Sequence, residues 1–317
     1  MFNDAMREAF GPEYLGWLAV LLVVVLGAAT AEGLVKTYLR RESYDWKAYF
    51  SSLADMAGRR GVEAIGLSLA APAMAFAYAH RINTIELSGP LAFLLLFIGQ
   101  DFCYYWYHRT SHRVGWFWAN HSVHHSPNEL TLATAVRLGW TGKLAGNMMF
   151  YAPLVWLGFS PTAVIATYSA NLLYQFWLHA PWMPKLGWFE LIFNTPTHHK
   201  VHHASNPEYL DCNYGGVLIV FDRMFGSFVD LKDDVEPIYG LTTPLTTNNP
   251  VKIAFHGWIN LGRDLMAAKT WKNRALVLVG PPGALAKAEE AAAHAAANAA
   301  TRDAGHTVMA ELAGPAR

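Results

Sequence analysis

Three apolar segments stand out in the first third of the chain. Leu15 to Ala31 holds no charged residue, and its apolar character continues past Glu32, which gives about the length that a helix needs to cross a bilayer. Gly61 to Ala79 is a weaker segment, and Gly89 to Tyr107 is strongly apolar in its first half. The pattern predicts three membrane-spanning helices.

A fourth apolar segment, Leu144 to Ala180, is interrupted by Gly158-Phe159-Ser160-Pro161. Glycine and proline in such a cluster mark a turn, so this segment predicts a helical hairpin whose short first arm only dips into the membrane. The four segments together predict an all-α integral membrane helical bundle with about four or five membrane-embedded helices.

Composition and charge support a membrane location. The residues AVILMFWYC make up 53% of the chain and DEKR only 15%, whereas about 25% of residues are charged in typical soluble domains. The three acids Asp4, Glu8 and Glu13 before the first segment argue against a cleaved signal peptide. The loop between the first two segments is basic, which by the positive-inside rule places it in the cytoplasm. Its basic residues are Lys36, Arg40, Arg41, Lys47, Arg59 and Arg60.

Composition also divides the chain into three ranges. Residues 1–100 carry the N-terminal membrane helices, and 101–250 form a histidine-rich catalytic domain. Within it, the less hydrophobic part after Pro181 is expected to form a cytoplasmic cap. Residues 251–317 form a C-terminal segment whose alanine-rich tail, from Pro281, is expected to be a frayed helix or disordered.

Ten of the fourteen histidines lie between positions 108 and 203. The first cluster has i, i+4 spacing, and the second and third repeat one pattern, a histidine, two other residues and a histidine pair. Residues three and four apart share a helix face, so these spacings present imidazoles in one direction, as a metal ion requires. The nine clustered candidates are His108, His112, His121, His124, His125, His179, His199, His202 and His203.

Nine imidazoles exceed what one ion binds, because a structural zinc site closes with about four ligands. The number therefore predicts a dinuclear site in which each metal has roughly four or five imidazoles. Imidazole suits iron, zinc, copper and nickel, so the ligand type does not identify the metal. The isolated residues His80, His256, His294 and His306 are not expected to be ligands.

Several functions are disfavoured by what the sequence contains. Lys plus Arg equals Asp plus Glu at 24 each, which does not favour a nucleic acid partner. Cys103 and Cys212 follow no metal or redox spacing. The sequence has no G-x-G-x-x-G and no Cys-x-x-Cys-His motif, so electrons for any oxidation are expected from a separate protein.

Asp101 to Phe228 resembles the fatty acid hydroxylase and sterol desaturase superfamily of membrane-bound di-iron enzymes. The resemblance rests on QDFCYYWYHRTSH, WFWANHSVHHSPNELTLATAVR, LLYQFWLH and NTPTHHKVHHASNPEYLDCNYGGVLIVFDRMFGSF. Within it, the second and third of these look most like alkylglycerol monooxygenases and their bacterial relatives. Bacterial sequences that it resembles also include sterol oxidases and ornithine lipid hydroxylases.

The resemblance implies a membrane-bound monooxygenase that hydroxylates a C–H bond of a lipid. It implies two iron ions on the nine histidines above, O2 as oxidant and an external electron donor. The lipid is expected to be an ether lipid, a sterol or an amino-acid-containing lipid. The expected location is the cell (inner) membrane of a bacterium, with the site facing the cytoplasm. A sterol desaturase of the C-5 type is the alternative, since both reactions begin with the same hydrogen abstraction.

Four further residues are candidates for supporting the ligands. Asp101 lies about two helical turns before His108, where its carboxylate is placed to accept a ring proton from a ligand histidine or to pair with a nearby arginine. His198 is expected to support the third cluster or to substitute for a ligand in it. Asp211 and Asn213 follow that cluster and are expected to orient its histidines.

Substrate contacts are predicted just past the second cluster. Asn128, Glu129 and Arg137 are candidates for binding a polar head group, or else for a solvated cap. The aromatic residues between Tyr104 and Trp118 line either a pocket or an interfacial belt. A membrane metal carrier or a non-catalytic scaffold is disfavoured, because the first span is free of charge and every cluster is complete.

Overall fold

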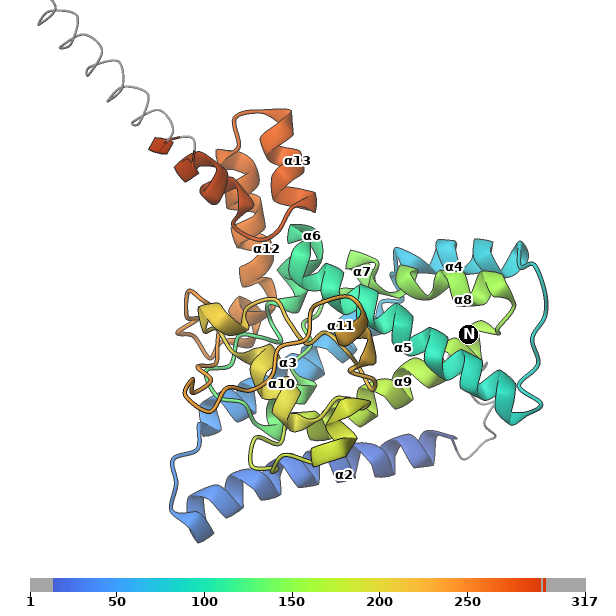
Figure 1. The fold of residues 1–317 in the computed structure, drawn as a ribbon, viewed down its shortest axis with the longest axis horizontal. Coiled ribbons are helices and arrows are strands. Elements are labelled where there is room, and N and C mark those ends of the chain that lie inside the picture. Colours follow the sequence, from blue (N-terminus) through green and yellow to red (C-terminus); the bar gives the residue numbers. More distant parts are fainter. Residues whose placement is uncertain (1–13, 292, 295–317) are drawn as a thin grey trace, which may run out of the picture.

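The computed structural model describes residues 14–291 and 293–294, and within them the chain is helical with no β-strand (Figure 1). The all-α prediction is confirmed for these residues. The remaining extended contacts are two isolated bridges, Phe193 with Leu218 and Ala204 with Tyr239. The elements are α2 (Tyr14–Leu34), η1 (Val35–Arg40), α3 (Trp46–Ala64), α4 (Ala70–Ala79), α5 (Pro90–Arg113), α6 (Gly115–His121), η2 (Leu132–Val136), α7 (Gly142–Ala145), η3 (Asn147–Tyr151), α8 (Ala152–Leu157), α9 (Pro161–Leu178), η4 (Gly187–Leu191), α10 (Pro196–His203), η5 (Pro207–Tyr209), α11 (Val220–Met224), α12 (Pro250–Ala267) and α13 (Trp271–Val279).

Helices α5 and α9 pack together in the centre of the molecule (Figure 1). Each begins with proline in its first turn, where the missing N–H removes no helical hydrogen bond. The predicted break between α8 and α9 is confirmed: Gly158 adopts φ 126°, and Ser160 Oγ accepts a hydrogen bond from the amide of Ala163 at 3.2 Å. A core that includes Leu96, Tyr104 and Leu154 joins α5 to α8.

Helix α2 exposes most of its apolar surface. Trp17 and Val23 are 68% and 70% exposed, and only 17% of the most apolar window of this helix is buried. It is attached to the body through buried Glu32, whose carboxylate accepts hydrogen bonds from Trp182 Nε1 at 2.9 Å and Leu132 N at 2.8 Å. Among the described residues, the continuous helix Gly16–Arg40 alone is both long and apolar enough to cross a membrane.

The prediction of a single span from Gly61 to Ala79 is wrong. Helix α3 ends at Ala64, and Gly66, with φ 79°, lies in the left-handed conformation that stops a helix. Helix α4 then has ten residues, about half of what a membrane-spanning helix needs. The predicted number of four or five membrane-embedded helices stays a prediction.

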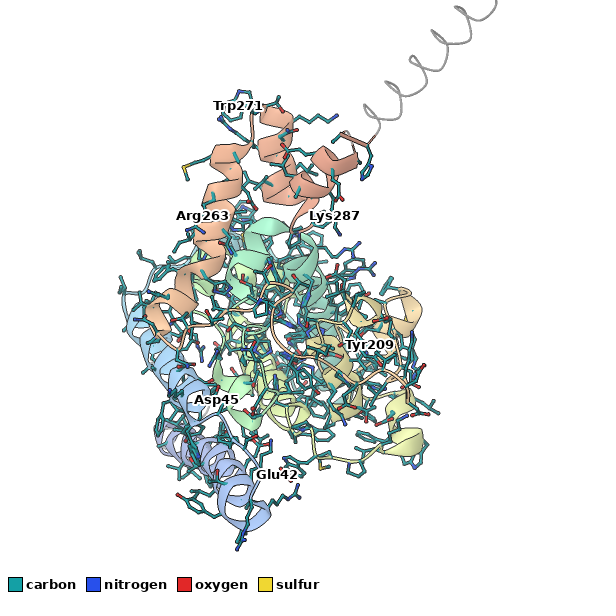
Figure 2. The ribbon with its side chains drawn as sticks, turned by 90° about the vertical axis from the view of Figure 1, so that its left-hand side faces the viewer. Glu42, Asp45, Tyr209, Arg263, Trp271 and Lys287 are labelled. Carbon is teal, nitrogen blue, oxygen red and sulfur yellow. The ribbon has the colours of Figure 1, made fainter. Side chains whose placement is uncertain are left out.

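The chain after Pro181 has short helices joined by loops, as its composition indicated. The C-terminal range then forms α12 and α13, which project from the body and carry Arg263 and Trp271 (Figure 2). Helix α12 packs against α6 and α3, and Gly257 permits its close approach to the carbonyl of Ala119. Residues 284–291 are helical, whereas His306 and most of the predicted alanine-rich tail lie outside the described residues.

Candidate metal centre

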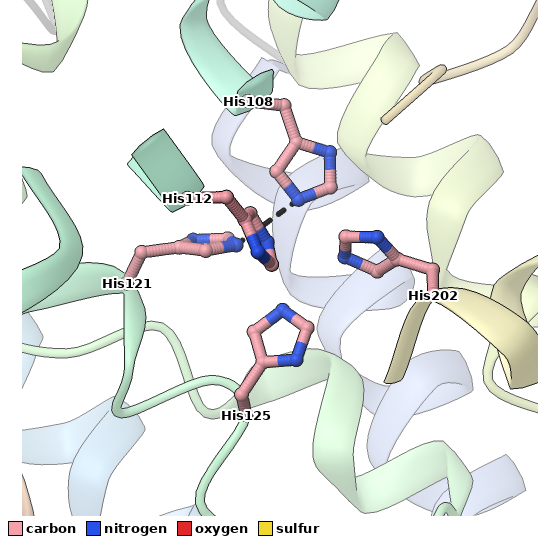
Figure 3. A group of neighbouring side chains, drawn as sticks. All are labelled: His108, His112, His121, His125 and His202. Carbon is pink, nitrogen blue, oxygen red and sulfur yellow. Dashed lines mark hydrogen bonds between the residues drawn. The ribbon is translucent and has the colours of Figure 1, made fainter. Parts of the chain in front are cut away.

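The nine histidines singled out by their spacing converge in two adjacent buried clusters. Helix α5, the end of α6 with the turn after it, the end of α9 and helix α10 deliver them. The ligand nitrogens within each cluster lie within 4.8 Å of one another. The first cluster, shown in Figure 3, comprises His108, His112, His121, His125 and His202, and the second comprises His124, His179, His199 and His203.

The two clusters divide the histidine motifs in a regular way. Pairs separated by four residues lie in the same cluster, as His121 and His125 do in the first and His199 and His203 do in the second. The middle histidine of the second and third motifs crosses over, so that His124 belongs to the second cluster and His202 to the first. The second and third motifs therefore each supply histidines to both clusters. The prediction that each motif presents all its imidazoles in one direction is wrong. In α10 adjacent side chains leave the helix about 100° apart, and in the second motif α6 ends at His121, so that His124 and His125 lie in a turn.

Backbone carbonyls orient four of the imidazoles. Tyr214 O accepts a hydrogen bond from Nδ1 of His108 at 2.9 Å. The same arrangement joins His124 to Arg137 O, His179 to Gln175 O and His202 to Cys212 O, at 2.9 to 3.0 Å. Because a carbonyl only accepts hydrogen bonds, each Nδ1 carries the proton and each Nε2 keeps its lone pair. This is the tautomer that binds a metal through Nε2.

The inward nitrogens lack the protons that would satisfy one another. Nε2 of His124 and Nε2 of His179 are 3.3 Å apart, although both rings already carry their proton on Nδ1. Nε2 of His112, His125 and His202 has no hydrogen-bond partner among the described residues. Buried polar atoms without partners destabilise a protein by about 1 to 3 kcal/mol each. A cation within each cluster removes this cost, so the residues present fit a metal pair.

Burial keeps these imidazoles neutral. It lowers the pKa of His124 to about 4, and it lowers the pKa values of His121, His125 and His202 well below 6.5. Desolvation is the largest cause in each case, followed for most of them by repulsion from neighbouring histidines. At neutral pH the lone pairs that bind metal are therefore available.

The metal-free protein is expected to lose stability as pH falls below about 6.5. Unfolded histidines bind protons there, whereas folded His124 stays neutral down to about pH 4, so this residue alone costs about 1.4 kcal/mol per pH unit. Asp222 acts in the opposite direction, since burial raises its pKa to about 6 and its contribution is lost as pH rises through that value. Burial also raises the pKa of Asp55, but the buried histidines with lowered pKa values outnumber these carboxylates.

Thermal unfolding of the metal-free chain, followed by circular dichroism at pH 7, 6 and 5, checks this expectation. A melting temperature that stays constant or rises between pH 7 and pH 5 would contradict it.

Asp101 does not contact a histidine ring. It is fully buried in α5 and accepts hydrogen bonds from the amides of Val217 and Leu218 at 2.9 and 2.8 Å and from Asn171 Nδ2 at 2.7 Å. The predicted hydrogen bond to a ligand, and the alternative pair with an arginine, are both replaced by these contacts. Its carboxylate instead fixes the loop that carries the Tyr214 carbonyl.

Asp222 holds the same loop from the other side. Its carboxylate accepts hydrogen bonds from the amides of Tyr214 and Gly215, both at 2.7 Å, and from Ser227 Oγ at 2.7 Å. Sequence reasoning missed Asp222 and Tyr214, because no spacing relates them to the histidines. A carboxylate followed five residues later by serine, near a glycine pair, was the one available signal.

The other predicted supporting residues have different environments. Asp211 lies 3.7 Å from Nδ1 of His112 and forms an ion pair with Arg113 at 2.9 Å, and these two partners hold the Asp211 pKa below its usual range. Asn213 donates hydrogen bonds to the carbonyls of His198 and Val229, not to an imidazole. His198 belongs to neither cluster, and its ring lies against Phe228.

The three residues that were predicted to bind a head group differ in their environments. Arg137 is 3% exposed, and it donates hydrogen bonds to Ser52 Oγ, Ser126 Oγ and Ala48 O. Its guanidinium is therefore used inside the fold, which makes the prediction of a head-group contact wrong for this residue. Asn128 is exposed and Glu129 is half-buried, so their role stays a prediction.

A cavity of about 160 Å³ reaches both clusters. His121 of the first cluster and His124 and His179 of the second line it, together with apolar and aromatic residues that include Leu172 and Phe176. The cavity gives a small molecule access to both groups of imidazoles from one side.

Several known proteins are similar to this chain. Alkylglycerol monooxygenase of Xenopus tropicalis is 40% identical over 205 residues, which cover 64% of this chain and 45% of the relative. The human alkylglycerol monooxygenase is 39% identical over the same coverage. An ornithine lipid hydroxylase of Rhizobium tropici is 27% identical over 203 residues, 61% of this chain and 60% of the relative. The matched part is thus less than half of the curated alkylglycerol monooxygenases.

No solved structure matches this chain. The family model described as fatty acid hydroxylase matches residues 93–227. This range holds all nine clustered histidines. It also holds Asp101 and Asp222, and the loop around Tyr214 that these two carboxylates bind. This part of the chain is therefore similar to the fatty acid hydroxylase family.

Proposed function

We propose that this protein is a membrane-bound monooxygenase that hydroxylates a C–H bond of a lipid. In this proposal the first and second histidine clusters each bind one iron ion, O2 is the oxidant and a separate protein supplies electrons. The observation that carries the proposal is that two buried clusters made only of imidazoles open onto one cavity.

Two iron ions would supply oxygen activation, and the chain would supply ligands, orientation and exclusion of water. Imidazoles are neutral ligands, so the pair would keep more positive charge than it would among carboxylates. The carbonyls of Tyr214, Arg137, Gln175 and Cys212 hold four rings in the metal-binding tautomer. The nine clustered histidines are at most 7% exposed, which limits the access of water to the two clusters.

Helix α2 supports the membrane part of the proposal. Its exposed apolar surface is of the kind that lipid covers, since soluble proteins rarely expose large contiguous apolar patches. The basic residues that follow it, from Lys36 onward, favour the cytoplasm for that end. We propose that the two clusters face the same side.

The names of the relatives supply the substrate class. Alkylglycerols and ornithine lipids share a polar head group and a long apolar chain. We propose such a lipid as the substrate and hydroxylation as the reaction, because both names describe oxygen insertion.

Lipid mass spectrometry tests the proposal. Membranes of cells that express the intact gene are compared with membranes of cells that express the His202→Ala variant. The expected result is a lipid that gains the mass of one oxygen atom only with the intact gene. A lipid that loses the mass of two hydrogen atoms would show that the reaction is desaturation and not hydroxylation. No change in any lipid, from a protein that carries two bound irons and is supplied with a reductant, would reject a lipid oxidase.

A further inference from the structure

Within the residues that line the cavity, three buried polar atoms have no partner in the described part of the chain. They are Nε of Arg59, Nε1 of Trp140 and Oδ1 of Asn147. A purely apolar ligand would leave all three unsatisfied, at a cost for each buried group. The same cavity contains three of the clustered histidines. A ligand that reaches the histidines therefore also lies beside the three residues that carry these atoms.

The hydrogen bonds that the three residues already make show which of their donors and acceptors remain free. Arg59 Nη1 pairs with Glu63 Oε1 at 3.3 Å, and its Nε–H remains a donor. Asn147 Nδ2 donates to Tyr107 Oη at 2.9 Å, which leaves Oδ1 as an acceptor. The lining residues therefore carry two N–H donors and one carbonyl acceptor, and the further cation in the lining, Lys143, is exposed. A hydroxyl group, which both accepts and donates, matches this set.

We infer that Arg59, Trp140 and Asn147 bind the hydroxyl-bearing head group of the lipid. This inference rests on the proposed function and names the part of the substrate that enters the cavity. A volume of about 160 Å³ equals about five water molecules at 30 Å³ each. It holds a small polar end and the adjoining carbons, while the rest of the chain lies outside. The predicted contacts at Asn128 and Glu129 are not part of this cavity.

Some residues that line the cavity lie outside the range that matches the family model. Arg59 and Glu63 belong to α3, whereas the fatty acid hydroxylase model begins at residue 93. Gly58 on the same helix lies directly under the Trp140 ring, and a Cβ there would overlap that ring. Helix α3 therefore sets the position of Trp140 as well as supplying Arg59. Selection of the head group depends on a helix that the family match does not include.

Binding to the metal-free full chain in detergent tests the inference without any turnover. The probes are radiolabelled 1-O-hexadecylglycerol and its 2,3-di-O-methyl ether, which keeps the chain and lacks the hydroxyl groups. Trp140→Phe removes the N–H and keeps most of the aromatic ring, and Asn147→Leu removes the acceptor. Arg60→Met is the matched control, since Arg60 also pairs with Glu63 but is exposed and does not line the cavity.

The expected result is that the wild-type chain binds the diol more tightly than the dimethyl ether. Trp140→Phe and Asn147→Leu each raise the Kd for the diol by about three- to tenfold, the effect of one lost hydrogen bond, and leave the Kd for the dimethyl ether unchanged. Arg60→Met changes neither value. Equal binding of both probes by the wild-type chain, or equal weakening of both by the variants, would overturn the inference. Because no metal or oxygen is present, these outcomes are independent of whether an oxidised lipid is found.

Discussion

His202→Ala is expected to remove the metal from the first cluster and to lower lipid oxidation by more than about a hundredfold. Even residues that only orient a metal ligand typically contribute 10- to 100-fold, and His202 supplies one of five nitrogens directly. His124→Ala is expected to do the same to the second cluster. Elemental analysis of the purified variants should show a loss of about one metal ion per chain in each case.

His198→Ala is the matched control for these variants. His198 precedes His199 in α10 and is equally buried, but it belongs to neither cluster and its ring lies against Phe228. Its replacement is expected to keep both metals. Full activity with two bound metals in the His202 or His124 variant would reject the two-cluster assignment.

Asp101→Asn is expected to lower the free energy of unfolding by about 3 kcal/mol, although Asp101 touches no histidine. An asparagine has one oxygen in place of two, so its amide nitrogen would face the backbone N–H of Val217 or Leu218. The loop would move and carry the Tyr214 carbonyl away from His108. Metal in the first cluster should therefore bind more weakly.

Asp211→Asn separates this effect from a simple loss of negative charge. Asp211 is 36% exposed and is paired with Arg113, so its replacement is expected to cost less than about 1 kcal/mol. Urea unfolding and metal titration of the two variants provide the comparison. If both variants have the same stability and the same metal affinity, the role assigned to Asp101 is incorrect.

The sequence was sufficient to predict which histidines gather, because local spacing and abundance identify them. It was not sufficient to predict how they divide, since the crossing of His124 and His202 depends on how the turn after α6 and helix α10 lie in the fold. The predicted apolar helix at the N-terminus and the hairpin break at Gly158 also have local causes. The failed span at 61–79 shows that hydropathy alone does not register a single left-handed glycine such as Gly66.

Long-range contacts explain the remaining differences. Asp101 shares the helix of His108, yet its partners lie 116 and 117 residues further along the chain. Arg137 lies next to the second histidine motif, but its donors are used by α3 and by Ser126. Arg59 and Trp140 meet at one cavity from positions that no motif links. Such pairings depend on tertiary packing, which a residue pattern along the chain does not contain.

The division of α10 between the clusters restricts how this segment can change in evolution or by design. A one-residue insertion between His199 and His202 would rotate the later imidazoles by about 100°, and both clusters would lose ligands together. Neither cluster can therefore be relocated, deleted or retuned by altering the length of this helix while the other is kept. We therefore expect the eight residues Pro196–His203 to accept a substitution at Lys200, which belongs to neither cluster, but not a change of length.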